Sequence, residues 1–218
     1  MTPVRVAVLV SGGGTNLQAL LDTFPGAART AAKVAPPPAA RITSVISNRP
    51  DAGALDRARR ADVPTTALSD PSDAAELLQA LNGCDLAVLA GYLKLVPPQA
   101  VARFRWRMIN IHPALLPAFG GPGMYGPKVH EAVLASGAAL SGPTVHYVDE
   151  QYDRGPIIAQ WPVPVRPGDT AETLAARVLA AEHKLLPRVV RALAARGEWT
   201  TPVRLHITNL DVEIEHDT

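Results

Sequence analysis

The first twenty-one residues constrain the fold most strongly. A continuous apolar run covers residues 4–10, stops at a serine and three glycines (11–14), and is followed at 15–21 by apolar residues with helical spacing. This order predicts a buried strand, a tight turn and a helix. An uninterrupted apolar strand is typical of a parallel sheet that is covered on both faces, because neither set of side chains meets water.

The same alternation continues through the first half of the chain. Strands are expected at 42–47, 65–68 and 86–90, and helices at 52–61 and 72–81. Alternating strands and helices predict the α/β class, with a single doubly wound, mostly parallel sheet and helices on both faces. Ligands of such sheets bind outside the carboxyl ends of the strands.

The second half changes character. A short strand is expected at 108–111, a helix opened by proline at 127–135, and two antiparallel strands at 143–148 and 157–165. Since these follow one another without a composition break, the expected organisation is one domain over residues 1–197.

A long helix is expected to close the domain. Asp169 is the predicted N-cap, with Glu172 three residues later, and Pro187 is expected to kink or interrupt the helix. The tail, residues 198–218, is predicted to be irregular or an edge strand. Residues 25–38, with three consecutive prolines, are predicted to form a surface loop.

Composition excludes several classes of partner. Lys and Arg number 21 and Asp and Glu 20, so the formal charge of +1 gives no field that would gather nucleic acid or an anionic membrane. No apolar run approaches the roughly 20 residues of a membrane-spanning helix. The single cysteine, Cys84, cannot form an internal disulfide, and the first residues lack a signal-peptide pattern. The expected location is therefore cytoplasmic.

The glycine turn is a candidate anion site. Residues 11–16 (Ser-Gly-Gly-Gly-Thr-Asn) would let unpaired backbone amides and a helix N-terminus face a ligand. A dinucleotide fingerprint would need glycine where Leu17 stands, and the Gly-Lys pair of a P-loop is absent. A phosphate monoester fits best, and a tight turn without a ligand is the alternative.

A second candidate site lies in the segment 108–117. Because side chains alternate along a strand, Asn110 and His112 share one face while Ile109 and Ile111 share the other. Two adjacent polar groups at a strand end indicate chemistry, since burying them otherwise costs free energy. The alternative for each of the six histidines is a hydrogen-bonded core residue. His130 is expected on a helix surface.

Several motifs together resemble a known family. Asn110-Ile111-His112-Pro113, the following Leu115-Leu116-Pro117 and the segment 152–156 (Tyr-Asp-Arg-Gly-Pro) resemble the folate-dependent formyltransferase superfamily. Within it, the chain is similar over residues 4–187 to the members that formylate 5-phosphoribosylglycinamide in purine synthesis. The segments that carry this likeness are 11–16, 90–94, 144–146 and 182–183. The resemblance implies a formyltransferase-type Rossmann-like fold.

The resemblance also implies a reaction. The formyl group of 10-formyltetrahydrofolate would pass to the amine of 5-phosphoribosylglycinamide by direct attack through an oxyanion intermediate. Asn110 and His112 would donate hydrogen bonds to the oxyanion. An ionised Asp153 would keep His112 positively charged and help to remove a proton from the amine. As a turn aspartate, Asp153 would need no such role.

Binding residues follow by position. The resemblance places the substrate phosphate on Gly14, Thr15 and Asn16, the ribose hydroxyls on Glu182, and the amine near Pro113. It implies that formyl-folate lies against Leu93, Lys94, Leu95, Val96, Asn110 and Asp149. No metal is expected, because no pair of histidines or carboxylates has ligand spacing.

Two departures from the family pattern limit the transfer of contacts. The loop 119–126 is longer than the common one, and no Lys or Arg lies between Asp70 and Leu81, where many relatives hold a substrate-contacting arginine. Lys94 is then a candidate base for the folate glutamate tail. Two other functions stay open: formylation of a different amine, such as an amino sugar nucleotide, and a non-catalytic phosphate sensor. The oligomeric state is open as well, a homodimer included.

Overall fold

The protein is described from a computed structural model that covers residues 2–24, 39–208 and 211–214. The predicted loop at 25–38 lies outside these residues. The elements of the first half are β1 Val4–Val10, α1 Thr15–Thr23, β2 Ala40–Ser47, α2 Gly53–Arg60, β3 Thr65–Ala67, α3 Ala74–Ala80, β4 Leu86–Leu89, α4 Pro98–Arg103 and β5 Met108–His112. Those of the second half are α5 Pro127–Ala135, β6 Leu140–Ser141, β7 Thr144–Tyr147, β8 Ile157–Gln160, β9 Val163–Pro164, α6 Ala171–Arg196, β10 Leu205–Thr208 and β11 Asp211–Ile214.

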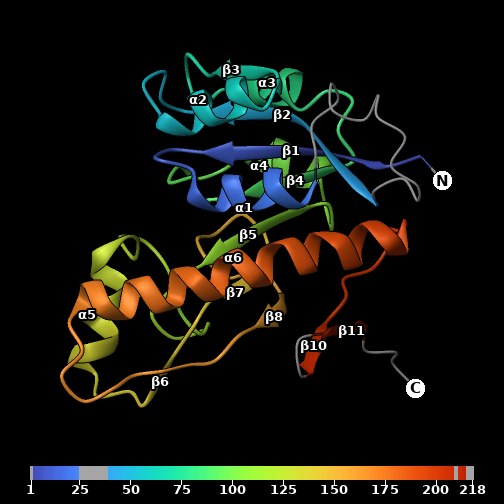
Figure 1. The fold of residues 1–218 in the computed structure, drawn as a ribbon. Helices are drawn as coiled ribbons and strands as arrows, with labels where there is room; N and C mark the ends of the chain where they lie inside the picture. Colours follow the sequence, from blue (N-terminus) through green and yellow to red (C-terminus); the bar gives the residue numbers. More distant parts are fainter. Residues whose placement is uncertain (1, 25–38, 209–210, 215–218) are drawn as a thin grey trace.

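The central sheet confirms the predicted α/β fold. In the described part of the chain it has seven strands in the order β3-β2-β1-β4-β5-β7-β8 (Figure 1). The first five strands of this order, β3, β2, β1, β4 and β5, run parallel to one another. Strand β7 is antiparallel to both β5 and β8. Since β1 lies between β2 and β4, the chain changes direction across the sheet beside β1, which is where doubly wound sheets bind ligands.

Two hydrophobic cores cover the two faces of this sheet. The side chains of β1 alternate between them: Val6, Val8 and Val10 pack with α1, α2 and α6, whereas Ala7 and Leu9 pack with α3 and α4. Burial on both faces explains why β1 is apolar at every position from Val6 to Val10.

A smaller core joins α5 to the first half of α6 and to β9 through Val133, Leu174 and Val178. It holds the segment after β5 against the long helix. His130 of α5 is buried, so the expectation of a surface histidine is wrong. The cause is that α5 packs against α6, which covers one face of the helix.

Helix α6 differs from its prediction in two ways. Its N-cap is Thr170, which forms a capping box with Thr173, and not Asp169. The Asp169 carboxylate instead accepts a hydrogen bond from the Arg166 amide and forms an ion pair with Arg177. Pro187 does not interrupt the helix, which runs unbroken to Arg196 (Figure 1), because the residues flanking the proline are packed in the core.

Several short elements also differ from expectation. The predicted strand 157–165 divides into β8 in the main sheet and β9, which pairs with β6, because Pro162 lacks the amide hydrogen that would continue the ladder. Strand β6 and helix α4 were not predicted. In the tail, β10 and β11 form an antiparallel pair of their own.

Among the described residues, no helix combines the length and apolar character needed to cross a bilayer.

Candidate active site

The candidate site lies at the carboxyl ends of β1, β4 and β5. The turn after β1 and the segment after β4 are tied together, because the Ser11 amide donates to the Gly91 carbonyl at 3.0 Å and Ser11 Oγ accepts from the Leu93 amide at 2.9 Å. The glycine turn and the segment 93–96 are thereby held side by side. Strand β5 ends next to them with His112.

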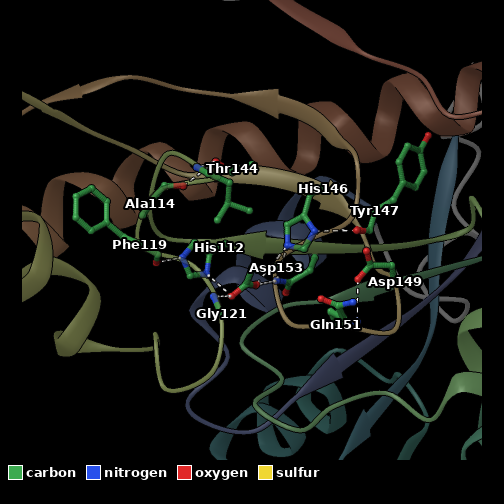
Figure 2. Close-up of polar contacts among 12 residues, drawn as sticks. His112, Ala114, Phe119, Gly121, Thr144, His146, Tyr147, Asp149, Gln151 and Asp153 are labelled. Atoms are coloured by element: carbon green, nitrogen blue, oxygen red, sulfur yellow. Dashed lines mark hydrogen bonds and ion pairs between the residues drawn. The ribbon is translucent and has the colours of Figure 1, made fainter.

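Asp153 lies at the centre of the polar cluster. One carboxylate oxygen, Oδ2, is 3.5 Å from His112 Nδ1 and accepts from the Gly121 amide at 2.9 Å (Figure 2). The other, Oδ1, accepts from Asn110 Nδ2 at 3.4 Å and is 3.5 Å from His146 Nε2. The structure therefore brings the three predicted catalytic residues together, with Asp153 bridging the other two.

Backbone geometry places the Asp153 side chain there. Asp153 adopts a positive φ of 56° in the loop between β7 and β8. Two residues later, a Cβ atom on Gly155 would stand 1.8 Å from the Tyr147 carbonyl oxygen, so only glycine allows the loop to close against β7. The Asp-Arg-Gly segment thus supplies a carboxylate and the close approach that positions it.

His112 is buried and held at both ring nitrogens. Its Nε2–H donates to the Phe119 carbonyl at 2.8 Å, and Nδ1 faces Asp153 (Figure 2). Because a carbonyl can only accept, the hydrogen on Nε2 is fixed. The Phe119 carbonyl therefore accepts the hydrogen that His112 would donate to an oxyanion.

Two opposing effects set the direction in which the pKa of His112 shifts. Burial lowers the pKa of His112, and the attraction of Asp153, although it opposes this, does not outweigh it. That Asp153 keeps the imidazole positively charged stays a prediction. For Asp153, burial alone would raise the pKa, but His146, His112 and the Gly121 amide together lower it by more. The net pKa therefore lies below its usual value, and the carboxylate stays ionised.

His146 is a member of the cluster that the sequence reasoning did not single out. It lies on β7 opposite Asn110, just as Thr144 lies opposite His112. His146 Nδ1 donates to the Tyr147 carbonyl at 2.8 Å, so Nε2 can accept from Asn110 Nδ2 at 3.0 Å. The signal was available in the sequence, because Thr144 and His146 alternate on one face as Asn110 and His112 do.

Thr144 fixes the turn that follows His112. Its buried hydroxyl donates to the Ala114 carbonyl at 2.6 Å and accepts from the Leu116 amide at 3.0 Å (Figure 2). Gln160 Nε2 also donates to this hydroxyl at 3.0 Å and to the Leu116 carbonyl at 2.9 Å. The turn at 113–117 is therefore hydrogen-bonded to both β7 and β8.

A cavity of about 290 Å³ opens beside Asp153. Its lining includes all the residues predicted to contact formyl-folate: Leu93, Lys94, Leu95, Val96, Asn110 and Asp149. Residues Gly121 to Tyr125, whose contacts were left open in the sequence analysis, also line this cavity. Leu93, Leu95, Tyr125 and Tyr152 are exposed at this cavity, so its walls are largely apolar while Asn110, His146 and Asp153 supply polar groups.

The predicted substrate residues form a second group. Asn16 Nδ2 donates a hydrogen bond to the Glu182 carboxylate, and both side chains are buried. Burial raises the pKa of Glu182 to about 7, which the bond from Asn16 only partly opposes. Pro113 and Glu182 line a second cavity of about 360 Å³ between α5 and α6, together with His130.

The comparison with family models decides the assignment. The model described as "Formyl transferase" matches residues 4–190, which is most of the chain. The chain belongs to the formyl transferase family.

Individual members of that family are similar over nearly the whole chain. A chloroplastic phosphoribosylglycinamide formyltransferase from Arabidopsis thaliana is 45% identical over 205 residues, which cover 89% of this chain and 67% of that protein. Phosphoribosylglycinamide formyltransferase from Haemophilus influenzae is 36% identical over 212 residues, covering 93% of this chain and 90% of that one. The crystal structure of phosphoribosylglycinamide formyltransferase from Anaplasma phagocytophilum aligns with a TM-score of 0.80 at 34% identity, covering 100% of this chain and 96% of that one.

Two observations complete the description of this formyl transferase. Within residues 2–24, 39–208 and 211–214, no group of three or more His, Cys, Asp or Glu side chains could hold a metal ion. Gly14 and Thr15 line neither of the two cavities described above; they lie at the start of α1, next to Asn16.

Proposed function

We propose that the protein transfers the formyl group of 10-formyltetrahydrofolate to the amine of 5-phosphoribosylglycinamide, a step of purine biosynthesis. The observation that carries this proposal is the position of Asp153. It contacts His112 and Asn110 and also lines the cavity whose other walls are the residues predicted for formyl-folate. The family and the activities named for its similar members support the same reaction.

Asn110 is proposed to donate to the oxyanion that develops on the formyl carbon. One amide hydrogen is held by His146 at 3.0 Å, whereas the other makes only a long 3.4 Å contact with Asp153. A long contact is weak, so this second hydrogen can turn to a substrate oxygen in the cavity at small cost. His146 then serves to fix the orientation of the amide.

His112 is proposed as the second donor, with its Nε2–H leaving the Phe119 carbonyl for the substrate oxyanion. In the unliganded protein burial lowers the pKa of His112. A negative charge that develops next to the ring favours the imidazolium, as does Asp153 on the other side. The imidazolium is therefore favoured as the oxyanion forms. A charge-assisted hydrogen bond is about twice as strong as a neutral one.

Asp153 is proposed to take up the proton of the attacking amine. Its lowered pKa keeps the carboxylate ionised at neutral pH. It lines the cavity proposed for formyl-folate, and a substrate amine entering beside Pro113 is proposed to meet the formyl carbon there. One side chain thus supports His112 electrostatically and accepts a proton.

The phosphoribosyl part of the substrate is proposed to lie between the glycine turn and α6. Gly14, Thr15 and Asn16 would hold the phosphate with their amides at the N-terminus of α1, and Glu182 would accept hydrogen bonds from the ribose hydroxyls. Support for the ribose part comes from Asn16 Oδ1, a hydrogen-bond acceptor that is buried without a partner in the described residues and could accept from a ribose hydroxyl. Buried polar atoms of this kind are usually satisfied by a ligand or water.

The remaining assignments are also proposals. Lys94 is the base for the folate glutamate tail, because it lies in the wall of the folate cavity. Residues 1–197 form the catalytic domain and 198–218 a tail. A cytoplasmic location is consistent with a single cysteine, Cys84, that has no partner in the chain for a disulfide.

A formyl-transfer assay tests the proposal. Purified protein is mixed with 10-formyltetrahydrofolate, and loss of the folate formyl group is followed with and without 5-phosphoribosylglycinamide. The expected result is turnover that depends on this amine. Turnover only with another amine, such as an amino sugar nucleotide, would contradict the substrate assignment, and no transfer to any amine would contradict the enzymatic function.

A further inference from the structure

Helix α2 holds the glycine turn from the side. The Ala54 amide donates to the Gly12 carbonyl at 3.0 Å, and Arg57 Nε donates to the Gly13 carbonyl at 2.7 Å. Arg57 is held in place by a further bond, from Nη1 to Gln18 Oε1 of α1 at 3.2 Å. Two consecutive carbonyls of the turn are therefore fixed toward α2.

Fixing these carbonyls also fixes two amides. In a trans peptide the C=O and the following N–H point in opposite directions. With the Gly13 carbonyl bound to Arg57, the Gly14 N–H must point away from α2, and the Gly12 carbonyl has the same effect on the Gly13 N–H. Within the described residues, neither the Gly13 amide nor the Gly14 amide donates a hydrogen bond.

The conformation of Gly14 completes a concave set of donors. Gly14 has the left-handed conformation, with φ 73° and ψ 40°, and is followed by the helical residues of α1. A left-handed residue next to right-handed ones turns successive amides toward one point, which suits an anion. Gly14 is also confined by α2, because a Cβ atom there would stand 2.6 Å from Ala54 Cβ.

We infer that Arg57 is a positioning residue for the substrate phosphate: it holds the Gly13 carbonyl so that the amides of the glycine turn face the anion. The inference rests on the phosphate site of the proposed function. Arg57 acts through the turn and is not a catalytic residue. It also keeps a positive charge beside Thr15 and Gln18, where it favours an anion at the start of α1.

Binding calorimetry with Arg57→Ala tests this inference. The dissociation constants of 5-phosphoribosylglycinamide and of its dephosphorylated analogue are measured for each protein, and their ratio reports recognition of the phosphate. In Arg57→Ala the affinity for the phosphorylated amine should fall by about tenfold or more, with little change for the analogue. Arg59→Ala is the matched control, since Arg59 lies on the same helix, is exposed and pairs with Asp56. It should keep the wild-type ratio.

Arg57→Lys guards against a general loss of structure. Lysine keeps the charge but cannot bind Gly13 and Gln18 with one planar group, so it should show an intermediate ratio and a near-wild-type melting temperature. An unchanged ratio in both variants, or equal weakening for both ligands, would overturn the inference. Because calorimetry needs no turnover, an inactive wild-type protein with this binding pattern would contradict formyl transfer and leave the role of Arg57 standing.

Discussion

Asp153 joins side chains from two strands that run in opposite directions. His112 and Asn110 come from β5 and His146 from β7, and each reaches this one carboxylate. Because His112 and Asp153 lie next to each other in this cluster, the protonation of each depends on that of the other. The structure shows that burial dominates for His112, whose pKa is lowered, while hydrogen bonds and neighbouring charges dominate for Asp153.

The sequence could place Asn110 and His112 on one face of a strand, but it could not give the direction in which the pKa of His112 shifts. That direction depends on how completely the ring leaves water in the folded protein, and the His112 ring is buried. Opposing effects of similar size decide the direction of a pKa shift, and only their balance in three dimensions settles it.

Glu182 yields a prediction about stability. Its pKa rises from 4.5 to about 7 in the folded protein, so the folded state binds this proton more tightly than the unfolded state does. The resulting stabilisation is fully present below pH 4.5 and is lost as the pH rises through about 7. Relative to Glu182→Gln, the wild-type protein should lose about 3 kcal/mol of unfolding free energy across this window.

Urea unfolding at several pH values between about 4.5 and 8 measures the difference. Glu131→Gln serves as the control, because Glu131 is exposed on α5 and should leave the wild-type pH dependence intact. Parallel curves for wild type and Glu182→Gln would show that Glu182 is not a buried group with a raised pKa.

At the scale of elements, the turn after β5 depends on β7 through Thr144. The hydroxyl donates to the Ala114 carbonyl and accepts from the Leu116 amide and from Gln160. Removing it therefore leaves buried polar groups without partners. Thr144→Val should reduce the unfolding free energy by about 1–3 kcal/mol and also lower turnover, because the turn directly follows His112.

Thr144→Ser keeps the hydroxyl and loses one methyl group, which costs only about 0.8 kcal/mol. Urea unfolding and the formyl-transfer assay on both variants measure the contrast. If the serine variant were as impaired as the valine variant, the methyl group and not the hydroxyl would hold the turn.

Elements with a strong pattern were predictable, and those shaped by tertiary packing were not. The apolar strand β1 and its glycine turn could be placed because both faces of the strand are buried. Helix α6 passes through Pro187 because packing on both sides outweighs the missing hydrogen bond, and β9 leaves the main sheet at Pro162 to pair with β6. Neither outcome is encoded by periodicity.

At the scale of the whole molecule, the order of the sheet brings the substrate sites together. The glycine turn after β1, the segment after β4 and the end of β5 come from adjacent parallel strands, so their carboxyl ends share one edge. Helix α6 crosses from the small core near α5 to α1 and carries Glu182 to Asn16 (Figure 1). The long helix therefore links the predicted phosphate site to the elements around Pro113.

The tail is also joined to this frame. The Val203 amide donates to Tyr147 Oη at 3.2 Å, and Leu205 is buried in the larger core. Tyr147 is the residue directly after His146, so the tail supports the strand that carries part of the polar cluster.

Turnover of His112→Ala, measured beside the binding of both substrates, tests the central claim most directly. The account predicts that turnover falls by about 10²- to 10⁴-fold while substrate affinities stay near those of the wild type. His206→Ala, which changes an exposed histidine, should retain full activity. Wild-type turnover in correctly folded His112→Ala would contradict the claim that the cluster around Asp153 performs the chemistry.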